Sequence, residues 1–327
     1  MSLRAAAERV VKGGGRISHS TLLRIEQGKL QPGAAELLQL AVAYDLPPDW
    51  ALDAVEAARL GIQPVSGTLQ EIVERGEEHW RRGEFAQAIG CALALREIEP
   101  FGEKQRVLLQ RASLDFATYC RGLGWTRLSR SLLEDLLKDP ATPTLAVRGL
   151  VLAASIWRDL GSLLVANAMI EHAARLLPKG DLRSRAMVEH QRAKLLTISG
   201  RHDEAARALA VALRAYRRVR DPQNECKARV LEIGILERLG RSEAAIRAGR
   251  RAVAESKRRG FKKVEANARA ELGRVLGASE RPAEAEEQLR LAIGIAARIG
   301  DERLEAEIRG RAKTSPAIQS ADDEMPA

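Results

Sequence analysis

The chain has 327 residues, a net charge of +9 and a sequence pI of about 9.8, and only 3% of its residues are aromatic. A basic balance of this size suits an anionic partner such as nucleic acid. Three widely separated cysteines, Cys91, Cys120 and Cys226, exclude a disulfide framework and predict reduced thiols in a cytoplasmic protein. No apolar run is long enough to span a bilayer and the first residues do not form a signal peptide, so we expect no membrane association.

Four short helices are predicted before residue 61. Helical propensity indicates the first over residues 2–11, and a glycine-rich segment follows it. Ser18 is suited to cap the second helix and Gly28 to end it, with Leu22 and Ile25 on its apolar face. Leucine spacing predicts a third helix over residues 34–44, and a fourth begins at Pro48 and continues to about residue 60.

The second of these helices resembles the recognition helix of the Cro and phage-repressor (XRE-type) helix-turn-helix family. The resemblance rests on the pattern Ser18-x-Ser20-Thr21-Leu22-x-Arg24-Ile25-Glu26-x-Gly28-Lys29 and the leucine-rich helix after it. It implies double-stranded DNA as a partner, with the first helical side chains in the major groove and Glu26 as a structural residue. The DNA-binding residues it implies are Ser18, His19, Ser20, Thr21, Arg24 and Lys29. Two departures stand against it: the chain starts at the family's second helix, and the turn is about five residues too long.

The charge distribution agrees with DNA contact at this helix. Residues 1–33 carry six Lys or Arg against two Glu, whereas residues 34–66 carry one Arg against five Asp or Glu. Positive charge therefore coincides with the recognition helix, as phosphate neutralisation requires. The alternative is a helical cap that no longer binds DNA.

A repeat of about 40 residues begins near residue 69. Turn positions recur at 83, 124, 161, 200, 240 and 280, and five of the six are glycine. Five residues after each turn lies a small residue, where two helices can cross closely. These are Ala88, Ser129, Ala166, Ala205, Ala245 and Ala285. The positions seven residues before each turn, and seven after each crossing residue, are also mostly small or leucine. Such self-similarity is typical of a solenoid of helix pairs.

This pattern resembles the tetratricopeptide (TPR) repeat in a long-helix form. It implies an all-α fold: a short helix-turn-helix segment over residues 1–61, a linker over 62–68, and a right-handed TPR-like solenoid of about six helix pairs over 69–313. We expect a charged capping helix from residue 301 to 313 and a disordered tail over 314–327.

The TPR resemblance also implies a concave groove lined by the first helix of each pair. When the groove positions of the TPR repeat are placed on this sequence, most of them are Arg or Lys. Such a groove favours a peptide or protein partner that is acidic or presents a C-terminal carboxylate. The predicted groove residues are Arg111, Arg121, Arg148, Arg158, His190, Lys194, Lys227, Arg238, Asn267 and Arg274. A second basic feature lies at residues 201–275, with 20 Lys or Arg against 10 Asp or Glu. Helix-dipole capping or nonspecific nucleic-acid contact can each account for it.

Catalytic motifs are absent: the sequence has no phosphate-binding GxxxxGK[ST], no HExxH and no GxSxG. The five histidines are scattered, so we expect no enzyme, no metal and no cofactor. Together the two resemblances imply a peptide-sensing transcription regulator that acts as a homodimer. The alternative is a TPR scaffold for protein interactions with a degraded helix-turn-helix.

Overall fold

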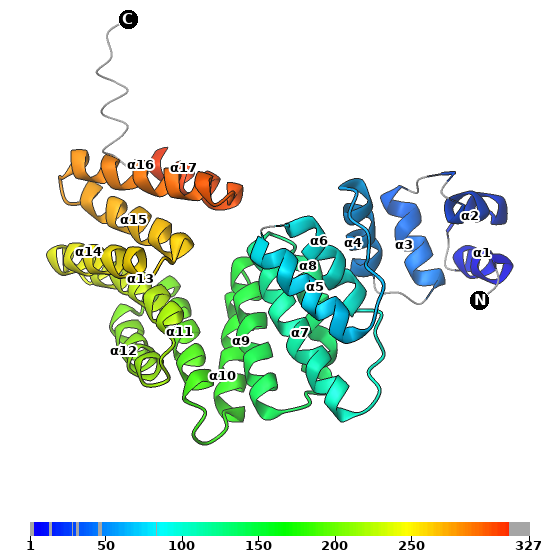
Figure 1. Ribbon diagram of the computed structural model, residues 1–327, viewed down its shortest axis with the longest axis horizontal. Helices are drawn as coiled ribbons and strands as arrows, with labels where there is room; N and C mark the ends of the chain where they lie inside the picture. The colour runs from blue at the N-terminus through cyan, green and yellow to red at the C-terminus, as the bar shows by residue number, and fades with distance from the viewer. Residues whose placement is uncertain are drawn as a thin grey trace, which may run out of the picture. The chain divides into compact units, whose positions relative to one another are not determined.

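The computed structural model describes residues 3–12, 15–27, 29–30, 33–44, 48–82 and 84–313. Within these ranges the protein has seventeen α-helices and no strand (Figure 1). The predicted all-α solenoid fold is thereby confirmed. The chain forms two compact units, Met1–Ile156 and Trp157–Ala327. Gly28, Gly83 and the predicted tail lie outside the described residues.

The first unit begins with the four predicted short helices. They are α1 (Leu3–Lys12), α2 (His19–Glu26), α3 (Ala34–Ala43) and α4 (Pro48–Arg59). Leu22 of α2, 1% exposed, packs with Ala6 and Val10 of α1 and with Ala43 of α3. A small apolar core therefore positions α2 against its two neighbours.

The helix pairs of the first unit follow residue 68. They are α5 (Leu69–Arg82) with α6 (Phe85–Leu95), and α7 (Glu103–Gly122) with α8 (Thr126–Lys138). Helix α9 (Pro143–Asp159) continues past the boundary into the second unit. Gly76 shows how closely α5 approaches α7, because a Cβ built there would lie 2.2 Å from the Phe116 ring. Only a glycine fits this crossing without displacing the ring.

The second unit contains the three most regular repeats. Its helices are α10 (Leu163–Leu176), α11 (Leu182–Ile198), α12 (His202–Arg218), α13 (Pro222–Arg238), α14 (Ser242–Arg258), α15 (Lys262–Gly277), α16 (Pro282–Arg298) and α17 (Glu302–Lys313). The first helices of successive pairs contact one another, α11 with α13 and α13 with α15. Each second helix packs between two first helices: α12 contacts α11 and α13, and α14 contacts α13 and α15. In Figure 1, α12 and α14 accordingly lie on the outer side of α11 and α13.

All six predicted crossing residues are buried. Ala88 is 3% exposed and Ala285 is 1% exposed, while the four between them are fully buried. The small residues paired with them, such as Ala193 and Ala212, are also fully buried. The interior is thus built from alanine contacts supplemented by leucine and isoleucine, which explains why so few aromatic residues are needed. The three cysteines are buried and free, as predicted.

The turns adopt the backbone conformation that the repeat predicts. Gly200 has φ 75° and Gly240 has φ 71°, in the left-handed region that favours glycine. Glu280, the one non-glycine turn position, takes the same conformation with φ 57°. Side-chain caps are found instead on first helices of the pairs: Asp181 at the start of α11, for example, accepts a hydrogen bond from the Ser184 N–H at 2.9 Å.

Candidate functional site

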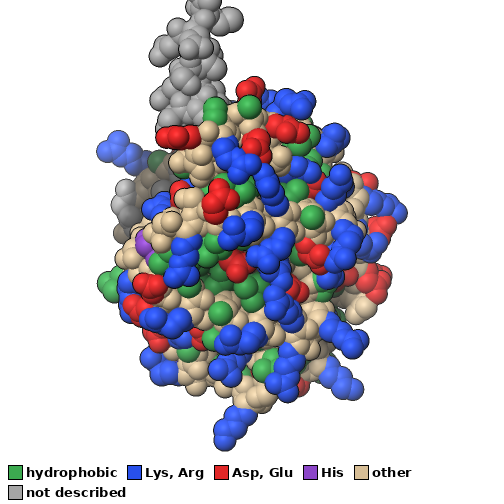
Figure 2. All heavy atoms as spheres, turned by 90° about the vertical axis from the view of Figure 1, so that its left-hand side faces the viewer, with side chains coloured by type: hydrophobic (Ala, Val, Ile, Leu, Met, Phe, Trp, Pro, Cys, Tyr) green, Lys and Arg blue, Asp and Glu red, His purple; other side chains and the backbone are tan. Residues whose placement is uncertain are grey.

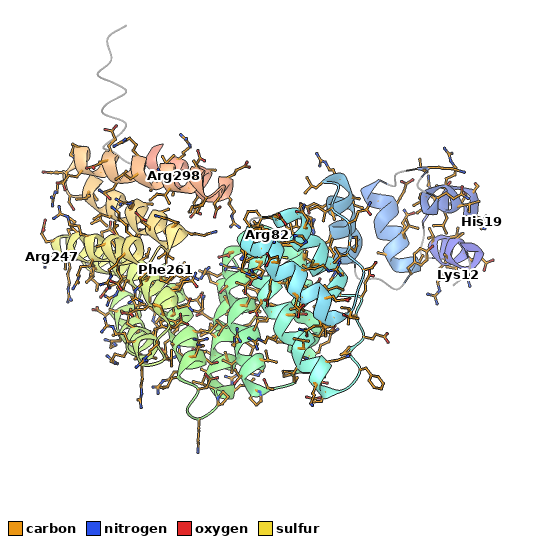
Figure 3. The ribbon with its side chains drawn as sticks, viewed as in Figure 1. Lys12, His19, Arg82, Arg247, Phe261 and Arg298 are labelled. Carbon is orange, nitrogen blue, oxygen red and sulfur yellow. The ribbon has the colours of Figure 1, made fainter. Side chains whose placement is uncertain are left out.

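Helix α2 exposes the side chains that the helix-turn-helix resemblance implies. Ser18 caps the helix by accepting a hydrogen bond from the Thr21 N–H at 3.1 Å. Its hydroxyl also lies 2.9 Å from the hydroxyl oxygens of Ser20 and Thr21. His19, Arg24 and Lys29 are exposed, and Figure 3 shows His19 on the outer side of α2. The structure therefore brings the three hydroxyl residues together and leaves the basic side chains accessible.

Helix α4 is joined to the helix pairs by buried charge that the sequence reasoning missed. Asp53 is 1% exposed, and its Oδ2 lies 2.9 Å from Nη1 of Arg96, which is 8% exposed. The same Arg96 nitrogen donates to the Ser131 hydroxyl at 3.0 Å. Arg127 of α8 adds an ion pair of 2.6 Å to Glu56. Asp53 lies four residues before Ala57 and so shares a helix face with it, and the structure shows that both are buried.

The predicted groove residues of the first unit do not form one basic cluster. Arg111 is exposed on α7 and Arg121 is half-buried near the end of the same helix. Arg148 lies on α9, with Nη2 at 3.6 Å from Asp115 Oδ1. Burial raises the pKa of Asp115, which the guanidinium groups of Arg148 and Arg111 oppose. Arg148 and Arg111 therefore face a carboxylate of their own unit.

In the second unit, three predicted cations surround a histidine. His190 of α11 was expected to be exposed at the groove, but it is only 5% exposed. Its ring packs edge-on against the Tyr216 ring of α12 at a centroid distance of 6.0 Å, and Nδ1 lies 3.4 Å from the Tyr216 hydroxyl. The other ring nitrogen, Nε2, is buried without a hydrogen-bond partner among the described residues. Interhelical packing therefore removes His190 from the surface that the TPR register assigned to it.

The surroundings of His190 are strongly positive. Burial lowers the pKa of His190 well below its ordinary value, and the charges of Lys194, Lys227 and Arg158 lower it further. These residues come from α11, α13 and the last turn of α9. Arg158 is held in place by Gln191, which accepts from Nη1 at 2.8 Å, and by Asp159 at 2.7 Å. A carboxylate placed beside the two lysines would relieve this concentration of positive charge. We call Arg158, His190, Lys194 and Lys227 the α11 cationic cluster.

The remaining predicted groove residues are engaged within the protein. Arg274 of α15 pairs with Glu237 of α13 through Nη1 at 2.8 Å, and its Nε pairs with Glu271 at 3.1 Å. Arg238 is 63% exposed and lies 3.7 Å from the same Glu237. Asn267, expected to bond a peptide backbone, donates from Nδ2 to the Lys263 carbonyl at 2.9 Å. The predicted basic row thus comprises the α11 cationic cluster and a second part in which Arg274 and Arg238 both face Glu237.

No group of three or more His, Cys, Asp or Glu side chains in the described part of the chain is arranged to hold a metal ion. Burial raises the pKa of Cys120 to about 12, so this thiol is protonated at neutral pH. None of the described helices has the length and apolar character needed to cross a membrane.

Comparison with known proteins finds no matching family model and no matching curated protein. Among solved structures, the chain is similar to a Signal Transduction ATPase with Numerous Domains (STAND) protein with a tetratricopeptide repeat sensor from Pyrococcus horikoshii. The TM-score is 0.54 at 15% identity, and the match covers 91% of this chain and 45% of the STAND protein. This chain therefore spans about half the length of the STAND protein. BtubC (BKLC) from P. vanneervenii has a TM-score of 0.46 at 17% identity, over 72% of this chain and 93% of that one. With the buried crossing alanines and the left-handed turns, the first likeness establishes that this chain has a TPR-like α-solenoid fold.

Proposed function

We propose that this protein is a transcription regulator that contacts double-stranded DNA through α2 and binds an anionic peptide or protein through its solenoid. The observation that carries the DNA-binding part is the capped, outward-facing start of α2. Capping fixes the helix where side chains would enter a major groove. His19, Arg24 and Lys29 are exposed there. Packing of Leu22 on α1 and α3 supplies the rigid base that such a helix requires.

The partner-binding part of the proposal rests on the α11 cationic cluster. Helical-repeat solenoids bind their partners along the surface formed by successive helices. A TPR sensor is also part of the STAND protein to which this chain is similar. Lys194 and Lys227 project from consecutive first helices, so one extended chain can reach both. A C-terminal carboxylate or an acidic side chain is the group that these charges would stabilise.

The DNA-binding part is tested by mobility shift with the DNA upstream of the protein's own gene. Arg24→Ala is expected to weaken binding to the preferred site by about 1–3 kcal/mol if Arg24 contacts a base. Lys29→Ala is expected to weaken binding to all sequences and to lower the salt slope by about 0.9 if it contacts a phosphate. Arg59→Ala, an equal loss of charge at the exposed end of α4, is the control. Equal binding by all three variants and the wild type would contradict a role for α2.

The partner site is tested by a thermal-shift screen of acidic peptides and small carboxylates. Ligands that bind the folded protein raise its melting temperature in proportion to their concentration and affinity. We expect Lys194→Glu/Lys227→Glu to abolish these shifts, while Lys138→Glu/Lys179→Glu, which changes the charge equally at exposed sites, keeps them. If both double variants respond like the wild type to every hit, the ligand binds elsewhere.

A second candidate function is a scaffold for protein interactions in which residues 1–61 only cap the solenoid. The observation that favours it is the buried Asp53–Arg96 pair, which attaches α4 to the helix pairs as a capping helix would be attached. The two candidates differ in one measurement: a scaffold retains the ligand-induced thermal shift but shows no dependence of DNA binding on α2.

A further inference from the structure

The second unit carries a set of exposed arginines on its outer helices that the proposed function does not use. Arg207, Arg214 and Arg218 lie on α12, and Arg247 and Arg251 lie on α14. All five are exposed, and none forms an ion pair with any side chain that the structure describes. We call these five residues the outer arginine face. Figure 2, which views the molecule from the left-hand side of Figure 1, shows many Lys and Arg side chains among Asp and Glu side chains, and Figure 3 places Arg247 at that left-hand side.

Several cations on the inner helices of the same unit are held in ion pairs with nearby carboxylates. Arg229 of α13 pairs with Glu225 at 3.0 Å, and Arg269 of α15 pairs with Glu265 at 3.0 Å. Lys263 reaches Asp301 at 2.6 Å. The charges of these three inner cations are therefore balanced by carboxylates, whereas the five outer arginines have no ion pair among the described residues, although the charge of Arg207 contributes to lowering the pKa of Glu204. An unbalanced row of like charges repels itself, and an anion placed over it removes that cost.

Helical geometry places the five arginines in two rows, one on α12 and one on α14. Arg207 and Arg247 each follow a buried crossing alanine, Ala205 or Ala245, by two residues, which is about 200° around a helix. Arg214 and Arg218 follow Arg207 after seven and eleven residues, so all three point away from the packed face of α12. The row is about 16 Å long, at 1.5 Å per residue. Both helices pack on α13, which holds the two rows on one rigid support.

We propose that the outer arginine face binds duplex nucleic acid through the phosphate backbone, without reading bases. A duplex presents about one negative charge per 1.7 Å of its axis. The rows of arginines can therefore contact phosphates at any position along the duplex. Arginine is the preferred phosphate ligand because its planar guanidinium can donate two hydrogen bonds to one phosphate. An anionic membrane is a poorer fit, because from residue 201 onward no described large hydrophobic side chain is exposed to insert into lipid.

The test is fluorescence anisotropy with a 30-base-pair duplex of scrambled sequence, titrated with the full chain across a range of salt concentrations. We expect Arg207→Gln/Arg214→Gln/Arg247→Gln to bind more weakly at every salt concentration. The slope of log affinity against log salt should fall by about 2–3, since each lost phosphate contact removes about 0.9. The control is Arg81→Gln/Arg82→Gln/Arg309→Gln, which removes the same charge from arginines paired with Glu78 and Glu305. Its slope should match that of the wild type.

Further variants and one vesicle-binding measurement distinguish this inference from the role of α2. Arg24→Ala should leave binding to the scrambled duplex nearly unchanged, because this face does not depend on α2. Loss of scrambled-duplex binding in Arg24→Ala together with wild-type binding in the outer-face variant would overturn the inference and leave the proposed function intact. Equal slopes for the outer-face and control variants would also overturn it. So would binding to phosphatidylserine vesicles, lost in the outer-face variant, without any binding to the duplex.

Discussion

Ser129 donates a hydrogen bond from its Oγ to the backbone carbonyl oxygen of Ala117, 2.6 Å away, where α8 crosses α7. Both residues are fully buried. In the other five repeats the position of Ser129 is alanine, so this crossing alone among the six gains a side-chain hydrogen bond. The serine that replaces alanine in the second repeat thus has a structural role at its crossing.

Ser129→Ala is expected to lower the free energy of unfolding by about 1 kcal/mol, because it removes one buried hydrogen bond while keeping a residue that fits the crossing. Urea denaturation of the variant against wild type measures the change. Ser66→Ala, at an exposed position before α5, serves as the control and should be neutral. A Ser129→Ala variant as stable as this control would show that the hydrogen bond contributes nothing.

Ala245→Leu should overpack the crossing of α14 with its neighbours. Ala245 is fully buried, and added methylenes in a packed interior typically cost about 1–3 kcal/mol. Ala254→Leu introduces the same side chain on the exposed face of the same helix and is expected to change stability by less than about 0.5 kcal/mol. Thermal unfolding of the pair tests the repeat register directly. Similar melting temperatures for both would contradict it.

Removal of Arg96 is expected to be among the most damaging single changes in the first unit. Arg96→Met leaves the buried Asp53 carboxylate with the more distant Arg127 Nε, 3.5 Å from its Oδ1, whereas complete loss of the partner of a buried charge typically costs about 3–5 kcal/mol. Adding Asp53→Asn to that variant removes the buried charge and should recover part of the stability. A double-mutant cycle by urea denaturation measures the coupling. Strictly additive losses would show that the two side chains do not interact energetically.

His190 should make the protein less stable as the pH falls. Its pKa is lowered in the folded state by burial and by Lys194, Lys227 and Arg158, so only the unfolded chain binds a proton there near pH 6. Stability from this group is complete above the unfolded pKa of about 6.5 and is lost below it, by up to about 1.4 kcal/mol per pH unit.

Unfolding measured between pH 7 and pH 5 tests this expectation. The wild type should lose more stability over that range than His190→Gln, which has no proton to bind. His172→Gln, at an exposed position on α10, should retain the wild-type dependence. If His190→Gln and His172→Gln follow the same pH profile, His190 does not carry the effect.

Much of the fold could be predicted because its constraints are local and repeated. Left-handed turns require glycine or a tolerated substitute such as Glu280, and close helix crossings require small residues such as Ala205. Both requirements recur about every 40 residues, so six imperfect copies reinforce one another. The helix cap at Ser18 could also be predicted from the sequence, because it depends only on the residues that follow it.

The candidate sites could be predicted only in part, because exposure and pairing depend on residues from other helices. The TPR register assigned His190 to an open groove, yet Tyr216, 26 residues away in sequence, buries its ring. Arg274 was expected to meet a ligand, but Glu237 of the preceding repeat already holds it. Nothing near Asp53 in the sequence indicates that Arg96 neutralises it.

The sequence by itself determined the period, the turn positions, the buried alanines and the excess of positive charge, because each follows from residue type and spacing along one chain. Only the tertiary structure decided which of those charges are balanced. An ion pair forms where two side chains from different helices meet within a few ångströms, and that meeting depends on how the helices cross. The crossings that bury Ala205 and Ala245 leave Arg207 and Arg247 about 200° away around their helices, on the exposed side.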